Sequence, residues 1–121
     1  MYTSMKDADT PCMELTPVLD VFAARWKAEI LWHLRARPRR FNELRRLVGP
    51  VSQKMLTTQL RALERDGLVQ REVLVRSPIR VEYSSTPLAI SIHPLLESVY
   101  QWWKRRWKDV ERARQRYERG G

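Results

Sequence analysis

The sequence has little of several features that mark specialised classes of protein. Its one cysteine, Cys12, cannot form an internal disulfide or a cysteine-based metal site, which excludes a disulfide-stapled secreted domain. Four glycines and seven prolines among 121 residues exclude collagen-like and low-complexity chains. No apolar run approaches the ~18 residues of a membrane span, and residues 1–11 show no signal-peptide pattern. We expect one cytoplasmic domain that does not contact a membrane.

Catalytic signatures are equally scarce. The two histidines, His33 and His93, lie far apart in helical patterns and are expected to be structural. There is no His-Glu-x-x-His, no glycine-rich phosphate loop and no Gly-x-Ser-x-Gly. We therefore expect no enzyme activity, no cofactor and no metal.

Positive charge, by contrast, is abundant. Lysine and arginine total 23 against 14 acidic residues, which gives a net charge of +9. Residues 25–80 hold fourteen basic and five acidic residues, whereas residues 1–24 hold one basic and four acidic residues. This imbalance indicates a polyanionic partner, usually nucleic acid, although a solubilising surface is the alternative.

Helical spacing of apolar residues predicts two helices in the first third of the chain. The first begins near Thr16, with Pro17 at its first helical position. The second spans residues 26–36 and ends before Pro38. Trp26, Ile30, Leu31 and Leu34 form its apolar face, opposite Lys27, Glu29 and Arg35.

A pair of helices joined by a short break follows. The first spans residues 41–48 and ends at Gly49-Pro50, with Phe41, Leu44, Leu47 and Val48 facing inward. Ser52 is expected to cap the second and Gly67 to end it, with Leu56, Leu60 and Leu63 inward. Such a pair is a helix-turn-helix, whose second helix usually enters the major groove of DNA.

Two strands and a final helix complete the chain. Residues 68–76 and 80–85 alternate apolar and polar side chains about a turn at Ser77-Pro78, which predicts a β-hairpin with a basic tip. Residues 87–117 are helical again, with Pro94 expected to end, kink or start a helix. The expected fold class is mainly α with a small β-hairpin, a winged helix-turn-helix with extra terminal helices for dimerisation. We divide it into a flexible tail at 1–11, the winged domain at 12–111 and a charged, fraying tail at 112–121.

The outward face of residues 52–66 has the chemistry of base recognition. It carries no acid from 52 to 63. Glutamine can bond adenine, arginine and lysine can bond guanine, and threonine offers a hydroxyl and a methyl. An ordinary solvated face is the alternative, although such faces usually carry acid–base pairs. The candidate residues are Ser52, Gln53, Lys54, Thr57, Thr58 and Arg61.

Other arginines are candidates for phosphate contacts. Arg76 and Arg80 lie at the hairpin tip, where the alternative is a charged edge strand that discourages aggregation. Arg37, Arg39 and Arg40 precede the third helix, where a solvated charge run is the alternative.

The final helix carries more aromatic area than a domain of this size can bury. Tryptophan is enriched in interfaces, so we expect the first and last helices to form a homodimer, although the last helix folding back on its own domain is the alternative. A twofold dimer places two recognition helices about one DNA turn apart and requires a roughly palindromic site. The candidate interface residues are Leu19, Phe22, Leu96, Val99, Trp102, Trp103 and Trp107.

Three segments together resemble the HxlR-type winged-helix transcriptional regulators, which are related to the MarR group. They are PRRFNELRR (38–46), VSQKMLTTQLRALERDGLVQRE (51–72) and SPIRVEYSST (77–86). The resemblance covers about residues 12–107 and implies a bacterial, homodimeric DNA-binding regulator. It places the recognition helix at 52–66 and the wing at 75–81. The chain departs from the family pattern at Ala23-Ala24-Arg25 and at Ala89, neither of which lies on the expected DNA face.

The resemblance also directs attention to Cys12. Several family members carry a cysteine before the first helix, and some respond to oxidants through it. Cys12 has one nearby base, Lys6, against Asp9 and Glu14, which does not favour a low thiol pKa. An inert, partly buried thiol is the alternative.

The expected function is therefore sequence-specific repression of transcription by a homodimer on double-stranded DNA. Modulation by an unidentified small molecule or by oxidation at Cys12 is a further expectation. The alternatives are a non-specific architectural nucleic-acid binder and an adaptor that binds proteins through the Trp-rich helix.

Overall fold

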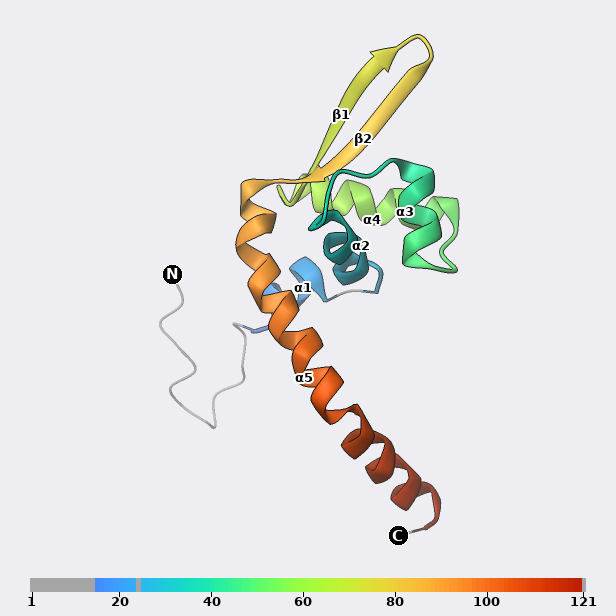
Figure 1. Ribbon diagram of the computed structural model, residues 1–121, viewed down its shortest axis with the longest axis vertical. Helices are drawn as coiled ribbons and strands as arrows, with labels where there is room; N and C mark the ends of the chain where they lie inside the picture. The colour runs from blue at the N-terminus through green and yellow to red at the C-terminus, as the bar shows by residue number, and fades with distance from the viewer. Residues whose placement is uncertain (1–14, 24, 121) are drawn as a thin grey trace.

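The computed structural model describes residues 15–23 and 25–120, without the side chains of residues 15, 16 and 22. The helices α1 to α4 form a body that carries a β-hairpin at one end, and the long helix α5 runs past its other end (Figure 1). This is the winged helix-turn-helix expected from the sequence. The elements are α1 (Leu15–Phe22), α2 (Lys27–Leu34), α3 (Phe41–Val48), α4 (Gln53–Arg65), β1 (Val69–Arg76), β2 (Ile79–Ser85) and α5 (Pro87–Glu118).

The core forms where α2, α3 and α4 meet. Leu31, Leu44 and Leu56 have no exposed surface, and Leu60 and Leu63 extend the same cluster along α4. Fully burying a leucine contributes ~1.5–3 kcal/mol. The apolar stripe of α4 is therefore buried within the chain, and the polar face of α4 is exposed to solvent.

Both ends of α4 follow the sequence prediction. The Ser52 side chain accepts a hydrogen bond from the Met55 backbone N–H at 3.0 Å, which satisfies a first-turn donor. Gly67 has a φ of 78°, a left-handed conformation that glycine adopts readily after a helix. The recognition helix therefore has a defined start and stop.

The antiparallel hairpin is fixed to the helical body at its base. Val69 pairs with Ser85 and Val73 with Val81, with an irregularity before Val75. At the base, Arg39 and Tyr83 exchange backbone hydrogen bonds of 2.9 and 2.7 Å. The segment that precedes α3 therefore holds the wing against the helix-turn-helix.

Thr86 joins the end of the hairpin to both α4 and α5. Its hydroxyl donates to the Gly67 carbonyl at 2.6 Å and accepts from the Ala89 N–H at 3.2 Å. Its backbone N–H donates to the Leu68 carbonyl at 3.2 Å. One residue thus connects the segment after the recognition helix to the first turn of α5.

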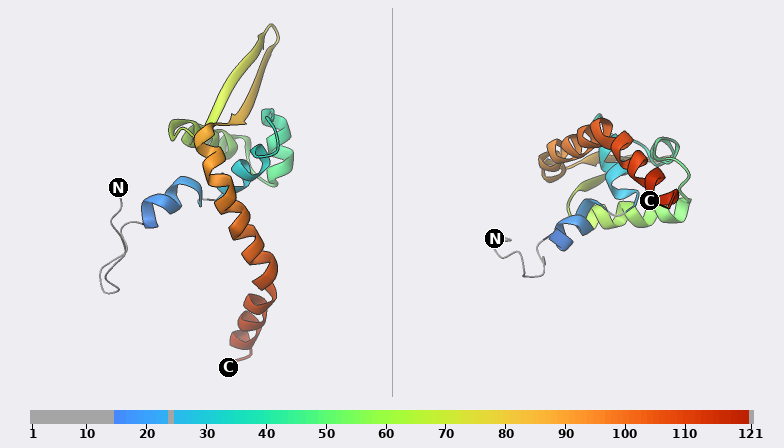
Figure 2. Two further views of the ribbon diagram at one scale, coloured as in Figure 1. Left: turned by 60° about the vertical axis from the view of Figure 1, so that its left-hand side comes forward. Right: turned by 90° about the horizontal axis from the view of Figure 1, so that it is seen from below.

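The long helix α5 differs from the prediction in two respects. It runs through Pro94 without a break, and Arg112–Glu118 continue the helix instead of fraying. Its second half extends away from the rest of the molecule in Figures 1 and 2. Among the described residues, no helix is long and apolar enough to cross a membrane.

Individual residues of the short helices also depart from the prediction. Trp26 precedes α2, and α2 ends at Leu34. Lys27 is buried instead of facing solvent, because its Nζ donates to the Asp20 carbonyl at 3.1 Å and so secures α1 to α2. Leu47 is exposed because it lies about 100° around α3 from Val48, off the line that packs inward.

Candidate nucleic-acid interface

The exposed face of α4 lies opposite its buried leucines. Lys54, Thr58 and Arg61 fall on this face at successive helical turns, and all three are exposed. Within the part of the chain that the structure describes, neither Lys54 nor Arg61 forms an ion pair. Their donors are therefore available to a ligand.

The two threonines of α4 present methyl groups and acceptor oxygens. Thr57 donates its hydroxyl proton to the Gln53 carbonyl at 2.8 Å, and Thr58 donates to the Lys54 carbonyl at 2.9 Å. Each oxygen keeps a lone pair, while the methyl suits contact with thymine. Thr57 is half-buried, so it lies at the margin of the face.

Arg65 is an outward residue that the sequence reasoning missed. It follows Arg61 by four residues, so the helical repeat alone could have identified it. Its side chain is 74% exposed and pairs with Asp66 at 3.2 Å. It lies ~18 Å along the helix from Gln53, at the end away from the expected groove contacts.

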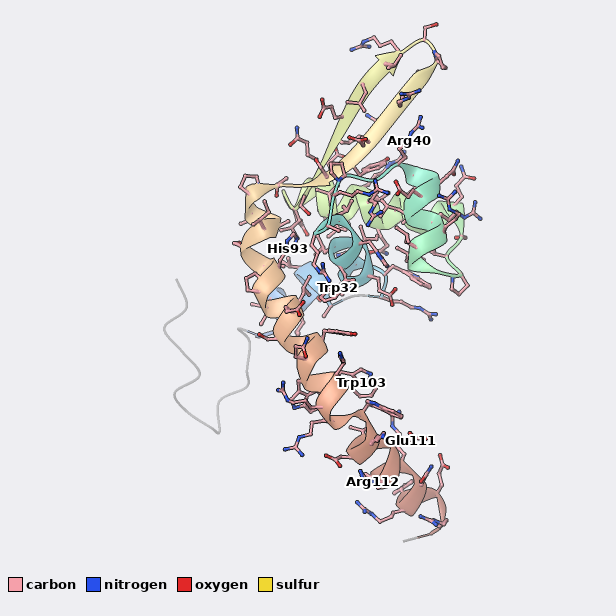
Figure 3. All side chains as sticks on the ribbon, in the orientation of Figure 1. Trp32, Arg40, His93, Trp103, Glu111 and Arg112 are labelled. Atoms are coloured by element: carbon pink, nitrogen blue, oxygen red, sulfur yellow. The ribbon has the colours of Figure 1, made fainter. Side chains whose placement is uncertain are left out.

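A polar groove of about 490 Å³ separates α3 from the wing. It brings together Arg40 and Arg80, which the sequence predicts as phosphate contacts, and adds Arg46, which it does not. Figure 3 shows Arg40 between α3 and the hairpin. Arg76 lies apart from this groove, near the hairpin tip.

Arg39 is placed inside the fold and not on its surface. Its side chain is 14% exposed; its Nε donates to the His33 carbonyl at 3.2 Å and its guanidinium pairs with Glu43 at 3.0 Å. Arg37 also pairs with Glu43. The side chains of Arg37 and Arg39 are therefore both paired with Glu43, whereas no ion pair of the Arg40 side chain occurs among the described residues.

The Glu43 carboxylate accepts hydrogen bonds from several donors at the start of α3. Desolvation alone would raise the pKa of its carboxyl, but hydrogen bonds from Arg39, the Arg40 backbone N–H and Arg37 outweigh it, and the pKa is lowered. The charged carboxylate therefore holds the segment that anchors the wing.

An apolar groove of about 390 Å³ runs between α2 and α5. Trp32 forms one wall, and the ring of Tyr100 packs against it with ring centroids 5.1 Å apart. The sequence analysis did not identify Trp32 as a groove residue. Trp103 lies at the lower end (Figure 3). Its other lining residues include Ala28, Glu29, His33, Leu96 and Val99.

The predicted interface residues divide into three groups. Leu96 is buried in the core of its own chain, so it is not a free contact residue. The side chain of Phe22 lies outside the described residues. The others are between 41% and 54% exposed: Leu19, Val99, Trp102, Trp103 and Trp107.

Both histidines have lowered pKa values. For His33 the largest cause is burial, followed by the nearby Arg39 guanidinium. For His93 burial again dominates, with Arg35 adding to it. The His93 Nε2 lies 3.4 Å from the Ser85 hydroxyl, so the neutral ring belongs to the junction of β2 and α5. No cluster of histidine, cysteine and acidic residues suited to a metal occurs in the described chain.

The fold and this basic surface define a winged helix-turn-helix protein. The chain belongs to the HxlR-like helix-turn-helix family, whose model matches residues 21–111. It is accordingly a transcriptional regulator of the helix-turn-helix type.

Individual relatives agree with this assignment. The HTH-type transcriptional regulator YdeP of Bacillus subtilis is 41% identical over 99 residues, which cover 79% of this chain and 77% of YdeP. The redox regulator HypR in its reduced form is 37% identical, with a TM-score of 0.77 over 80% of this chain and 96% of HypR. The reduced transcriptional regulator YodB of Bacillus subtilis is 28% identical, with a TM-score of 0.67 over 78% of this chain and 92% of YodB.

Proposed function

We propose that the protein is a homodimeric repressor that binds a roughly palindromic DNA operator. One observation carries the proposal: α4 buries its apolar stripe completely and exposes Lys54, Thr58 and Arg61 on a face without an acid. Helices of this kind in helix-turn-helix proteins enter the major groove.

The surrounding arginines suit contacts with the DNA backbone. Arg40, Arg46 and Arg80 converge on one groove, and their charges fix register on the duplex without reading sequence. Arg76 near the wing tip is placed to reach the flanking backbone. A protein bound in this way blocks a promoter by occupying it, which is the basis for proposing repression.

Homodimerisation is supported by the exposed aromatic residues of α5. Trp102, Trp103 and Trp107 expose large side chains on a helix that extends past the body (Figure 1). Aromatic side chains of this size dominate interface energetics when a partner covers them. Two recognition helices about one DNA turn apart then require a palindromic site.

The test is selection of duplexes from a random library, followed by affinity measurements on the selected and scrambled sequences across a salt series. We expect a palindromic sequence bound ~10³-fold or more tightly than scrambled DNA. Equal affinity for both would leave only the electrostatic contribution and would support an architectural binder. Repression is tested separately with a reporter placed behind the selected site.

Oxidation at Cys12 is proposed as one input to this regulator. Cys12 lies outside the described residues, so support comes from the family relation to HypR, a redox regulator, and to YodB, which has been crystallised after diamide treatment. We expect diamide to change the operator affinity of the native protein but not of Cys12→Ser. Unchanged affinity in the native protein would reject this input. A small-molecule effector stays a prediction from sequence.

A further inference from the structure

The tip of the β-hairpin exposes an apolar side chain between two arginines. Ile79 is 73% exposed, more than any other large aliphatic side chain that the structure describes. It pairs with Arg76 at the last position of the hairpin, and Arg80 follows it directly. Pro78, in the turn, is also exposed. Because these apolar groups contribute nothing to the core of their own chain, the fold alone does not account for them.

The charges around the tip favour a polyanion as its ligand. Residues 73–81 contain two arginines and no acidic residue. Neither Arg76 nor Arg80 forms an ion pair with another described residue. Nearer the body, Glu72 and Glu82 lie directly opposite each other, an arrangement of like charges that destabilises a hairpin. Their carboxylates repel phosphates, so they confine a contact with DNA to the part of the wing beyond them.

The tip is long enough to enter a minor groove but too wide to do so unless the groove opens. From Glu72 to Arg76 the strand rises ~13 Å, at about 3.3 Å a residue. The minor groove of B-DNA is about 7.5 Å deep and ~6 Å wide. The axes of two paired strands are ~4.8 Å apart, and their atoms extend further on both sides. A hairpin of this width therefore fits only where the groove is widened.

The groove between α3 and the wing would hold a DNA strand beside the tip. Ile79 and Arg80 line its wing side, and Arg40 and Arg46 line its other side. A sugar–phosphate strand held by these arginines would run past Ile79. The hairpin projects from the helical body (Figures 1 and 2), so its tip can reach the minor groove that such a strand borders.

We propose that Pro78 and Ile79 form a wedge that inserts between two base pairs from the minor groove and bends the operator at that step. This inference rests on the DNA binding proposed above and adds a contact that responds to the deformability of the flanking sequence. Apolar wedges partly unstack a base step and kink the duplex by roughly 20–90° toward the major groove. The kink widens the minor groove and admits the hairpin, while Arg76 and Arg80 contact the phosphates that border it.

A wedge makes the protein selective at base pairs whose edges it does not contact. Pyrimidine–purine steps such as TA and CA are easily unstacked, whereas A-tracts are stiff and have a narrow minor groove. We therefore expect a flexible step at the wing position of the operator. Arginines alone would favour the opposite sequence, because the narrow groove of an A-tract attracts them. The preference at this position thus separates a wedge from a purely electrostatic wing.

Energy transfer between dyes at the two ends of the selected operator measures the bend. We expect the native protein to shorten the end-to-end distance and the double variant Pro78→Ala/Ile79→Ala to leave the duplex nearly straight, with an unchanged circular dichroism spectrum. Ile79→Leu keeps an apolar side chain and should keep the bend. Ile90→Ala removes an exposed isoleucine from α5 and is the matched control, which should bend DNA as the native protein does. Equal bending by the double variant would overturn the wedge.

A second measurement compares operators that differ only at the step beside the wing. The native protein should bind the operator with a TA step roughly 5-fold or more tightly than one with an A-tract there, and the double variant should lose this preference. A native preference for the A-tract would reject the wedge in favour of arginines in a narrow groove.

The outcomes also separate this inference from the proposed function. If no sequence is selected from the library, the sequence-specific regulator and the wedge are both rejected. If an operator is selected but stays straight when the native protein binds, the wedge alone is rejected and the regulator stands.

Discussion

The helices α4 and α5 are both amphipathic, but the apolar stripe of α4 is buried within the chain and that of α5 is partly exposed. Leu56, Leu60 and Leu63 of α4 are all but completely buried within the chain. Trp103 and Trp107 of α5 remain nearly half exposed. The buried stripe of α4 therefore stabilises the fold and leaves its polar face for a ligand, whereas α5 leaves its apolar face for a partner. This difference is what the proposed function requires, a polar face for DNA and an apolar face for another copy of the chain.

The largest effect is expected at the buried stripe. Leu60→Ala should lower the free energy of unfolding by ~2–5 kcal/mol, because it leaves a cavity in the core. Trp107→Ala should leave this quantity nearly unchanged when both variants are measured below the concentration at which the proposed dimer forms. Chemical denaturation of both variants measures the contrast. A comparable loss from Trp107→Ala would mean that the second half of α5 packs on its own body.

The exposed stripe should instead govern association. Trp107→Asp should weaken the dimer by ~30-fold or more, since truncating an interface hot spot costs ~2 kcal/mol or more. Circular dichroism should be unchanged, because no core residue is altered. Sedimentation equilibrium provides the measurement, and Ser98→Asp, an exposed position on the opposite side of α5, is the matched control. An unaltered dissociation constant would place the interface elsewhere.

On the polar face of α4, position along the helix should matter. Arg61→Ala should reduce affinity for the selected operator by ~1–3 kcal/mol and relax base preference at one position, as expected for a lost base contact. Arg65→Ala removes the same charge one turn further from the start of the helix and should change base preference little. Equal relaxation by both variants would contradict our placement of the recognition surface.

The groove between α3 and the wing should act on all duplexes alike. Arg46→Ala should reduce the slope of log affinity against log salt by about 1 and leave sequence preference intact. Arg105→Ala removes an equal charge from the exposed side of α5 and serves as the control. Identical slopes for the two variants would show that net charge, and not this groove, determines the effect.

The smallest effect concerns pH. The pKa values of His33 and His93 are lowered from the ordinary histidine value of 6.5, so the unfolded chain binds protons more readily than the folded one. Stability should be full above about pH 6.5 and should fall as pH drops through the folded pKa values. Thermal unfolding between pH 7 and 5 measures it, and His33→Asn should flatten the profile. A stability that rises on acidification would contradict the direction of both shifts.

Sequence reasoning succeeded where the signals were local. Ser52 and Gly67 delimit α4 because capping and termination depend on neighbours within a few residues. The alternation of residues 69–85 likewise specifies the hairpin directly. The fold class follows from the order of such elements.

It failed where a distant contact decided the outcome. Arg39 and Arg40 are adjacent and chemically identical, but only Arg40 is exposed. The Arg39 side chain binds Glu43 and the His33 carbonyl, and its backbone pairs with Tyr83. Lys27 is buried because its Nζ donates a hydrogen bond to the Asp20 carbonyl of α1. Trp32 contributes to a groove that exists only once α5 crosses α2, and no periodicity within α2 indicates this.

In the proposed dimer, the junction at Thr86 would connect the contact between the two chains to the spacing of their recognition helices. This residue bonds the carbonyl that follows α4 and caps α5, so a change in the angle at which two α5 helices cross would move both recognition helices with it. The distance between half-sites would then depend on a contact between α5 helices that is remote from the DNA. Substitutions in that contact would shift the operator spacing that the protein prefers without altering the bases that it reads.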